Sequence, residues 1–362
     1  MRLVALDRED RERLNGFVLS SPLAHFKQLY EWGEILEYEG TRAIRLGVER
    51  DGVLCASVVL YVRRLPGSPF TFLSGSRGPV FDAEDRRALG CLIEGVREVA
   101  RKCRAIFVRV DPDVPDSEPR VREALLDAGF SHLHEKNWSS LNDPRIVMRL
   151  DLTAPESEML SRLRATHRYH IRGIEKKGVR IRDAVSDEDV AKFHRVWSEV
   201  GARKGFPVRG LDYYRRLSTL FVQRSRGRLL LAENNDNVVA VLLALGVGRK
   251  AWVLSTGLTA SARKLHPNEA IWWETVLWAK RQGARVCDFG GTGTDWPPEE
   301  SSPGYPVFHF KQGFGAEAVY LTGYYDLVLR PRLYRLFRLA EERLLPRAGA
   351  VLNLVEKLRN KR

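Results

Sequence analysis

Apolar positions along the first 150 residues alternate between the spacing of helices and the spacing of strands. Helical spacing is found over Asp7–Val18, His25–Glu37, Arg86–Arg101 and Val121–Ala128. Short apolar runs bounded by turn residues predict strands over Ala43–Glu49, Val53–Val62, Phe70–Leu73, Ile106–Val110 and Ile146–Leu152. Helices interleaved with strands in this way predict an α/β domain over residues 1–150.

A loosely repeated order begins after residue 150. A long helix is predicted over Glu156–Lys177, and Ser186–Asp189 forms a capping box in front of a second helix over Val190–Val200. The next predicted elements are the strands Leu229–Glu233, Val238–Val247 and Ala251–Ser255, the helix Glu269–Gln282 and the strand Val286–Phe289. The sequence therefore predicts a second α/β domain over residues 151–317.

Composition constrains the partners more than the fold. The 362 residues include 59 Lys and Arg against 46 Asp and Glu, a formal net charge of +13. This balance favours a polyanionic partner such as RNA, a phosphorylated sugar or an anionic membrane face. The four cysteines have no Cys-x-x-Cys spacing, so we expect reduced thiols in a cytosolic protein, with no metal site. The longest uncharged apolar run, Val238–Gly248, is too short to span a bilayer.

Basic residues occupy every fourth position on one side of the predicted helix Glu156–Lys177. They are Arg164, Arg168, Arg172 and Lys176. Such a row can follow the phosphates of a nucleic acid, and it can equally be an ordinary solvated helix face. The sequence leaves both interpretations open.

The stretch 286–323 is the most informative part of the chain. The strand Val286–Phe289 runs into glycines at 290, 291 and 293, whose backbone freedom suits a close approach to another group. The chain then returns through Val307–Phe310, which predicts a second apolar strand, and the next residue is Lys311. An ammonium group at this point either completes the fold or stabilises charge that develops during a reaction.

Four short motifs in this half of the chain resemble those of the FemABX family, the aminoacyl-tRNA-dependent transferases that build peptidoglycan cross-bridges. In chain order they are Trp273-Glu274, Lys280–Gly283, Cys287–Gly291 and Phe310–Gly315. The resemblance implies two GNAT-like acyltransferase domains in tandem, the first completed by residues 318–362. The two-helix arm of some members is absent, because no long heptad stretch interrupts the second domain.

The resemblance also implies roles for individual residues. Lys311 would stabilise the oxyanion, and the backbone carbonyl of Phe310 would orient the attacking amine. Arg209 and Tyr213 would hold the acceptor phosphate and the peptide stem from one face of a helix. Arg77 and Asp82 would lie near the substrate groove, although Asp82 or Asp85 is also placed to cap the helix that begins at Arg86. The row from Arg164 to Lys176 would bind tRNA, and no cofactor is required.

Two other functions stay open on the sequence. A GNAT enzyme that uses acyl-CoA needs glycine amides around the pyrophosphate, but the corresponding loop has His266, Pro267 and Asn268. A non-catalytic basic protein that binds RNA or a glycan would explain the net charge equally well. That protein would have no use for the Phe310-Lys311 pair.

The predicted partners follow from the resemblance. They are an aminoacyl-tRNA donor and a peptidoglycan precursor as acceptor, either lipid II or a UDP-muramyl peptide, used by a cytoplasmic monomer. The chain end carries apolar residues at Leu344, Leu345, Val351, Leu352, Val355 and Leu358 among basic ones. This end is predicted either to pack on the first domain or to bind the inner face of the membrane.

Overall fold

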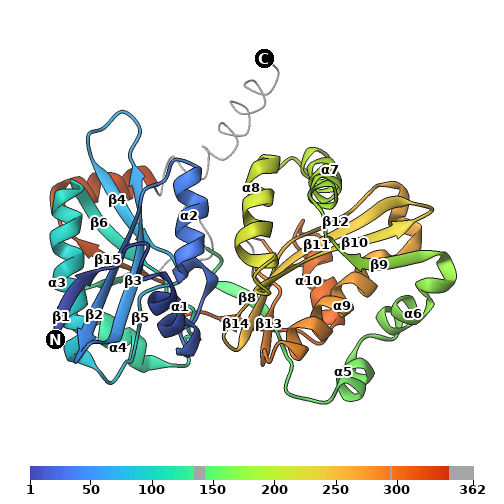
Figure 1. Cartoon of the computed structure of the whole chain (residues 1–362), viewed down its shortest axis with the longest axis horizontal. Helices are drawn as coiled ribbons and strands as arrows, with labels where there is room; N and C mark the ends of the chain where they lie inside the picture. Colours follow the sequence, from blue (N-terminus) through green and yellow to red (C-terminus); the bar gives the residue numbers. More distant parts are fainter. Residues whose placement is uncertain (134–142, 294–295, 342–362) are drawn as a thin grey trace. The chain divides into compact units, whose positions relative to one another are not determined.

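The computed structural model describes residues 1–133, 143–293 and 296–341. The chain divides into two compact units, which Figure 1 shows as separate sheets with their own helices. The first unit is Met1–Arg145 together with the later segment that begins at Tyr320, and the second is Ile146–Val319. The prediction of an α/β protein is confirmed for both units.

The sheet of the first unit has the strand order β1-β2-β3-β4-β6-β15-β7. The strands are β1 (Arg2–Ala5), β2 (Ala43–Arg50), β3 (Val53–Arg64), β4 (Thr71–Gly75), β6 (Ala105–Val110), β7 (Ser131–Leu133) and β15 (Tyr324–Val328), with β5 (Val80–Phe81) paired to β3. The strands β4 and β6 are parallel. The helices are α1 (Arg11–Ser20), α2 (Tyr30–Tyr38), α3 (Arg86–Lys102) and α4 (Pro119–Asp127).

The sheet of the second unit has the order β14-β8-β13-β12-β11-β10-β9. Its strands are β8 (Ile146–Asp151), β9 (Val179–Asp183), β10 (Gly227–Asn234), β11 (Asn237–Val247), β12 (Lys250–Leu258), β13 (Val286–Asp288) and β14 (Glu317–Tyr320). Here β12 and β13 form the parallel pair. One face is covered by α7 (Asp187–Lys204) with α8 (Leu211–Leu217), and the other by α9 (Pro267–Arg281) with α10 (Tyr305–Gly313) (Figure 1).

The predicted helix caps are confirmed. Asp85 Oδ1 accepts the backbone N–H of Ala88 at 3.0 Å, so Asp85 and not Asp82 caps α3. Ser186 Oγ accepts the N–H of Asp189 at 3.1 Å and caps α7. In both cases a side-chain oxygen satisfies an amide that the first helical turn leaves unpaired.

The prediction of a single helix over Glu156–Lys177 is wrong. The chain forms α5 (Glu156–Arg162), then α6 (Ala165–Gly173), then a 3-10 turn over Glu175–Lys177. Leu163 and Arg164 between the two helices have extended ψ angles of 150° and 141°. The break buries Leu163 in the core, and Arg168 donates to the carbonyls of Ser161 and Leu163 that the end of α5 leaves unpaired.

The strand predicted over Val307–Phe310 is also wrong, because this segment belongs to the helix α10. The alternation of apolar residues suggested a strand, but Phe310 and Phe314 are four residues apart and pack into the same aromatic cluster. Pro306 stands in the first helical turn, where proline removes no helical hydrogen bond.

The apolar chain end discussed above lies outside the described residues. The helix at 331–341, which precedes it, packs on the first unit through Leu333, Tyr334 and Phe337 against Phe72 and Phe107. None of the helices within the described ranges is both long enough and apolar enough to cross a membrane.

Candidate active site

The carboxyl end of β13 is built around a buried carboxylate. Asp288 Oδ2 accepts a hydrogen bond from Arg149 Nε at 2.9 Å, and Oδ1 accepts the backbone N–H of Gly290 at 2.7 Å. Gly290 has a φ of +73°, a conformation that glycine adopts without strain. The Asp-Phe-Gly-Gly motif therefore turns the chain sharply and leaves the carbonyls of Gly290 and Gly291 directed at a neighbouring group.

That neighbouring group is the ammonium of Lys311, on the last turn of α10. Lys311 is 4% exposed, and its Nζ donates to the carbonyl oxygens of Gly290 at 3.0 Å and Gly291 at 2.6 Å. Burial lowers the pKa of Lys311 to about 8, with the charge of Asp288 opposing the shift. Among the residues that the structure describes, no carboxylate lies within ion-pair distance of this ammonium. The site therefore holds a cation at neutral pH whose direct partners are neutral.

An aromatic cluster lies beside Lys311. The Phe310 ring is 5.2 Å from the Trp272 ring, 5.4 Å from the Phe314 ring and 5.3 Å from the His167 ring, centroid to centroid. His167 is buried, and its Nε2 lies 3.1 Å from the carbonyl oxygen of Phe310. Burial lowers the pKa of His167, so the neutral imidazole donates from Nε2 to that carbonyl.

His167 was missed on the sequence, because it contacts a residue 143 positions away in the chain. The glycine at 313 gave an indirect signal. A Cβ at Gly313 would lie 2.5 Å from the His167 ring, so the glycine of the Phe-Lys-x-Gly motif is needed for this contact.

The basic row predicted on one helix face is divided by the break between α5 and α6. Arg164 NH1 donates to the carbonyl of His309 at 3.1 Å, and Arg168 caps the end of α5. Arg172 and Lys176 are exposed. The first two therefore hold helices together, and the last two face solvent.

Arg209 and Tyr213 are brought together, but not on one helix. Arg209 precedes α8, and its guanidinium carbon lies 5.7 Å from the centroid of the Tyr213 ring. The pair belongs to the layer that contains α7 and α8, whereas Lys311 belongs to the layer that contains α9 (Figure 1).

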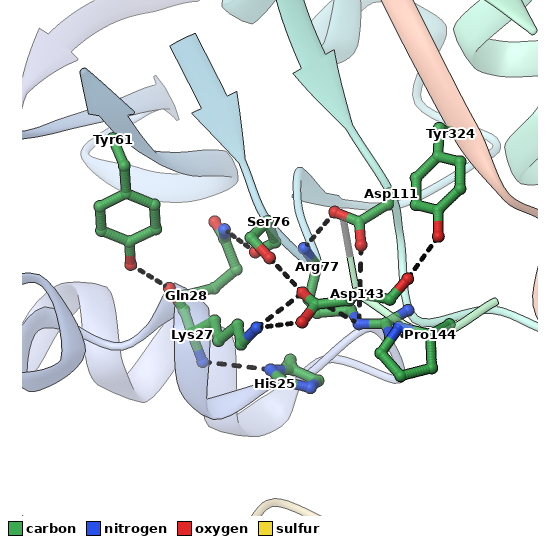
Figure 2. A network of polar contacts seen from close by, with 10 residues as sticks. All are labelled: His25, Lys27, Gln28, Tyr61, Ser76, Arg77, Asp111, Asp143, Pro144 and Tyr324. Carbon is green, nitrogen blue, oxygen red and sulfur yellow. Dashed lines mark hydrogen bonds and ion pairs between the residues drawn. The ribbon is translucent and has the colours of Figure 1, made fainter. Parts of the chain in front are cut away.

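Arg77 lies in a buried polar network of the first unit, which Figure 2 shows. Its backbone N–H donates to Asp111 Oδ1 at 2.9 Å and its guanidinium donates to the carbonyl of Pro144 at 2.9 Å. Lys27 and Ser76 bind Asp143 in the same network, and the charge of Lys27 holds the pKa of Asp143 well below its usual value. Burial raises the pKa of Asp111 to about 7. Asp82 is exposed and accepts the N–H of Glu84 in a turn.

The other motifs of the second unit have packing roles. Trp273 is buried in the core, and the backbone carbonyl of Glu274 accepts a hydrogen bond from Arg228. Lys280 Nζ donates to the carbonyls of Leu152 at 2.7 Å and Ala154 at 2.8 Å, which ties the end of α9 to the exit of β8.

Two GNAT-like units in one chain define a class of tandem acyltransferase folds. The structure is similar to the tandem GNAT protein from the clavulanic acid biosynthesis pathway, with a TM-score of 0.52, 14% identity, and coverage of 90% of this chain and 97% of that one. It is more similar to the crystal structure of FemX, with a TM-score of 0.84 and 21% identity over 93% of this chain and 99% of that one. The predicted tandem GNAT-like fold is confirmed.

The chain belongs to the FemAB family, whose model matches residues 10–235 and 227–342. It is 23% identical to the lipid II:glycine glycyltransferase of Staphylococcus aureus strain MRSA252, over 96% of this chain and 97% of that protein. The same degree of identity and coverage is found for the lipid II:glycine glycyltransferase of strain USA300. The resemblance inferred from the four short motifs is thus confirmed.

Proposed function

We propose that this chain is an aminoacyltransferase that moves an amino acid from aminoacyl-tRNA to an amine of a peptidoglycan precursor stem peptide. The acceptor is lipid-linked, as lipid II, or nucleotide-linked, as a UDP-muramyl peptide. Membership of the FemAB family and the similarity to lipid II:glycine glycyltransferases over nearly the whole of both chains support the reaction class. The observation that carries the proposal is the buried cation at Lys311, which the carbonyls of the glycine turn after β13 hold.

The ester of an aminoacyl-tRNA is already activated, so the enzyme needs no covalent nucleophile. The acceptor nitrogen attacks the ester carbonyl carbon and forms a C–N bond. The tetrahedral intermediate then collapses, the C–O bond to the terminal ribose breaks, and the amine proton passes to the leaving ribose oxygen. An oxyanion forms in between, and a preorganised cation is suited to stabilise it.

Lys311 is suited to that role and unsuited to act as a nucleophile. With a pKa of about 8, about nine-tenths of Lys311 is protonated at pH 7. The carbonyls of Gly290 and Gly291 occupy two of its three N–H donors within the described part of the chain, which leaves one for a substrate oxygen. The carbonyl of Phe310, oriented by His167, would accept a hydrogen bond from the attacking amine through its second lone pair.

Binding roles follow from exposure. We assign Arg209 and Tyr213 to the acceptor phosphate and stem, and the exposed Arg172 and Lys176 to tRNA phosphates. Arg164 and Arg168 position the helices that carry these side chains, because their own guanidinium groups donate to backbone carbonyls of the protein. The burial of Arg77 favours a structural role over substrate binding. Because the donor is a charged tRNA, the reaction takes place in the cytoplasm. A monomeric enzyme would reach a lipid-linked acceptor at the inner face of the membrane.

An acyl-CoA donor is the alternative that the experiment must separate. His266 precedes α9 with a φ of +57° and Pro267 follows it, so the loop lacks one amide that a pyrophosphate would need. Purified protein is incubated with precursor and a mixed pool of labelled aminoacyl-tRNA. The proposal predicts labelled precursor that pretreatment of the donor with RNase abolishes. Transfer from acetyl-CoA that resists RNase would contradict it.

A further inference from the structure

Two histidines and a glutamate meet in the second unit, away from Lys311. His170 lies on α6, His266 directly precedes α9, and Glu269 lies in the first turn of α9. The helix α6 packs against α9 (Figure 1). One ligand atom from each of the three side chains lies within 4.8 Å of the other two. The two imidazole rings are stacked, with centroids 3.8 Å apart and planes 6° from parallel.

The polar groups of this cluster are poorly satisfied by the protein. His170 Nδ1 and the neighbouring Asn268 Oδ1 are buried and have no hydrogen-bond partner among the described residues. Glu269 is 8% exposed, and its Oε1 lies 3.7 Å from His266 Nδ1, longer than an ordinary hydrogen bond. Buried polar atoms are normally hydrogen-bonded, so two unsatisfied atoms beside a third buried ligand group indicate a missing ligand.

We propose that His170, His266 and Glu269 bind a divalent transition-metal ion, with Zn²⁺ the best match. Two imidazoles and one carboxylate form a ligand set that zinc uses, with a fourth position left for water. The nitrogen donors argue against Ca²⁺ and Mg²⁺, which prefer oxygen ligands.

The geometry requires a small closure of the cluster. Zinc ligands at roughly 2.0–2.2 Å from the ion are about 3.4 Å apart in a tetrahedron, so ligand atoms that now lie up to 4.8 Å apart must approach by up to about 1.4 Å. Stacked parallel rings also direct their lone pairs side by side, so one imidazole must rotate. Lys177 lies nearby, and its positive charge acts on both His170 and Glu269. This charge lowers the affinity for a cation. It does not occupy the site, because Lys177 Nζ donates a hydrogen bond to the carbonyl of Leu265 at 3.0 Å.

The position of this cluster lets a bound ion link two helices of the second unit. It would tie α6 to the start of α9, and α6 carries both His167 and Arg172. His266 also lies in the loop where an acyl-CoA enzyme would place the backbone amides that bind pyrophosphate. No sequence spacing indicates the cluster, because His170 and His266 belong to elements far apart in the chain.

The test uses untagged full-length protein, stripped of metal with EDTA and titrated with Co²⁺ and Zn²⁺. We expect one ion per chain and the visible absorption of tetrahedral Co²⁺. The variants His170→Ala and His266→Asn should lose more affinity than the roughly 10- to 100-fold that follows loss of an outer partner. Asn tolerates the left-handed backbone at position 266, so His266→Asn keeps the local fold.

The control is His194→Ala, which removes a histidine of the same unit outside the cluster and should bind as the wild type does. Zn²⁺ should also raise the Tm of wild-type protein and of His194→Ala but not that of His266→Asn, whose Tm in EDTA should match that of the wild type. Absence of binding to the folded wild type would overturn the proposal. So would binding that survives both substitutions, because the ion would then sit elsewhere.

Discussion

In both units, polar groups lie at the carboxyl end of a parallel strand pair, but the charged groups have different partners in the two units. In the first unit, after β4 and β6, Arg77 faces Asp111 and Asp143, and Lys27 binds Asp143 at 2.5 Å. In the second unit, after β12 and β13, the ammonium of Lys311 donates to the backbone carbonyls of Gly290 and Gly291. In the first unit the cations face carboxylates, although burial still raises the pKa of Asp111 to about 7, whereas Lys311 keeps a charge that no ion pair in the described residues neutralises.

This difference has an energetic consequence. A lysine whose pKa falls from 10.5 to about 8 on folding destabilises the protein by on the order of 3 kcal/mol below pH 8. Only above pH 8 is this destabilisation relieved, as the folded state releases its proton before the unfolded state does. A buried charge retained at such a cost is typical of a functional site, and an ion network matched within itself is typical of a structural one.

The largest effect is expected in the first unit. Arg77→Met should lower the free energy of unfolding by about 3–5 kcal/mol, because it leaves the buried Asp111 and the half-buried Asp143 with one cation. Denaturation followed by tryptophan fluorescence measures this change. Arg87 is exposed, so the control Arg87→Met should have a free energy of unfolding within about 0.5 kcal/mol of the wild-type value. Unchanged stability with a raised KM for the acceptor would instead place Arg77 in substrate binding.

The second effect is on turnover. Lys311→Met should reduce kcat by about 100- to 1000-fold, the usual result of losing one oxyanion donor. Its stability should change little, because relief of the buried charge offsets the lost donor to the carbonyl of Gly291. Steady-state assays and thermal melts are compared with those of the exposed Lys204→Met. A variant with a lowered Tm that keeps the wild-type kcat below that Tm would make Lys311 a structural residue.

A smaller effect tests how the aromatic cluster is held. Gly313→Ala should destabilise the protein by about 1–3 kcal/mol, because the new Cβ would lie 2.5 Å from the His167 ring. Gly173→Ala in α6 is the matched control, since a Cβ there meets nothing within 4 Å. Equal stability of the two variants would show that His167 moves aside freely and does not fix the Phe310 carbonyl.

The smallest effect is expected at the pair formed by the exposed Arg209 and the half-buried Tyr213, in the layer that contains α7 and α8. Arg209→Ala should raise KM for the acceptor by up to about tenfold, or about 1.4 kcal/mol, with little change in kcat. A phosphate contact remote from the reaction stabilises ground and transition states alike. Arg195→Ala, exposed on α7 of the same unit, is the control. A fall in kcat at constant KM would refute this assignment.

The sequence predicted the longer strands and the helices that have clear caps. Hairpins such as β2–β3 and β10–β11 were found because alternation and turn residues are local signals. The strands β1 and β15 were missed, since each forms by pairing with strands that lie far away in the chain. The helix α10 was mistaken for a strand because its apolar residues also fit a period of two.

The candidate site was predicted in part. Lys311 and the glycines at 290 and 291 were identified from their motifs. The sequence did not predict that the backbone carbonyls of these glycines accept hydrogen bonds from the Lys311 ammonium. His167 and the burial of Arg77 could not be predicted, because each depends on contacts between residues far apart in the chain. Residue types at motif positions indicate the chemistry, whereas charge balance around them is set by the tertiary fold.

The pH dependence of kcat/KM for wild type and Lys311→Met tests the role of Lys311 most directly. Because both enzymes use the same acceptor amine, the ratio of their rates cancels the titration of the substrate. The account predicts a ratio that is constant below pH 8 and falls about tenfold per pH unit above it, as Lys311 loses its proton. A ratio that stays large and constant through pH 10 would contradict the claim that the charge of Lys311 stabilises the oxyanion.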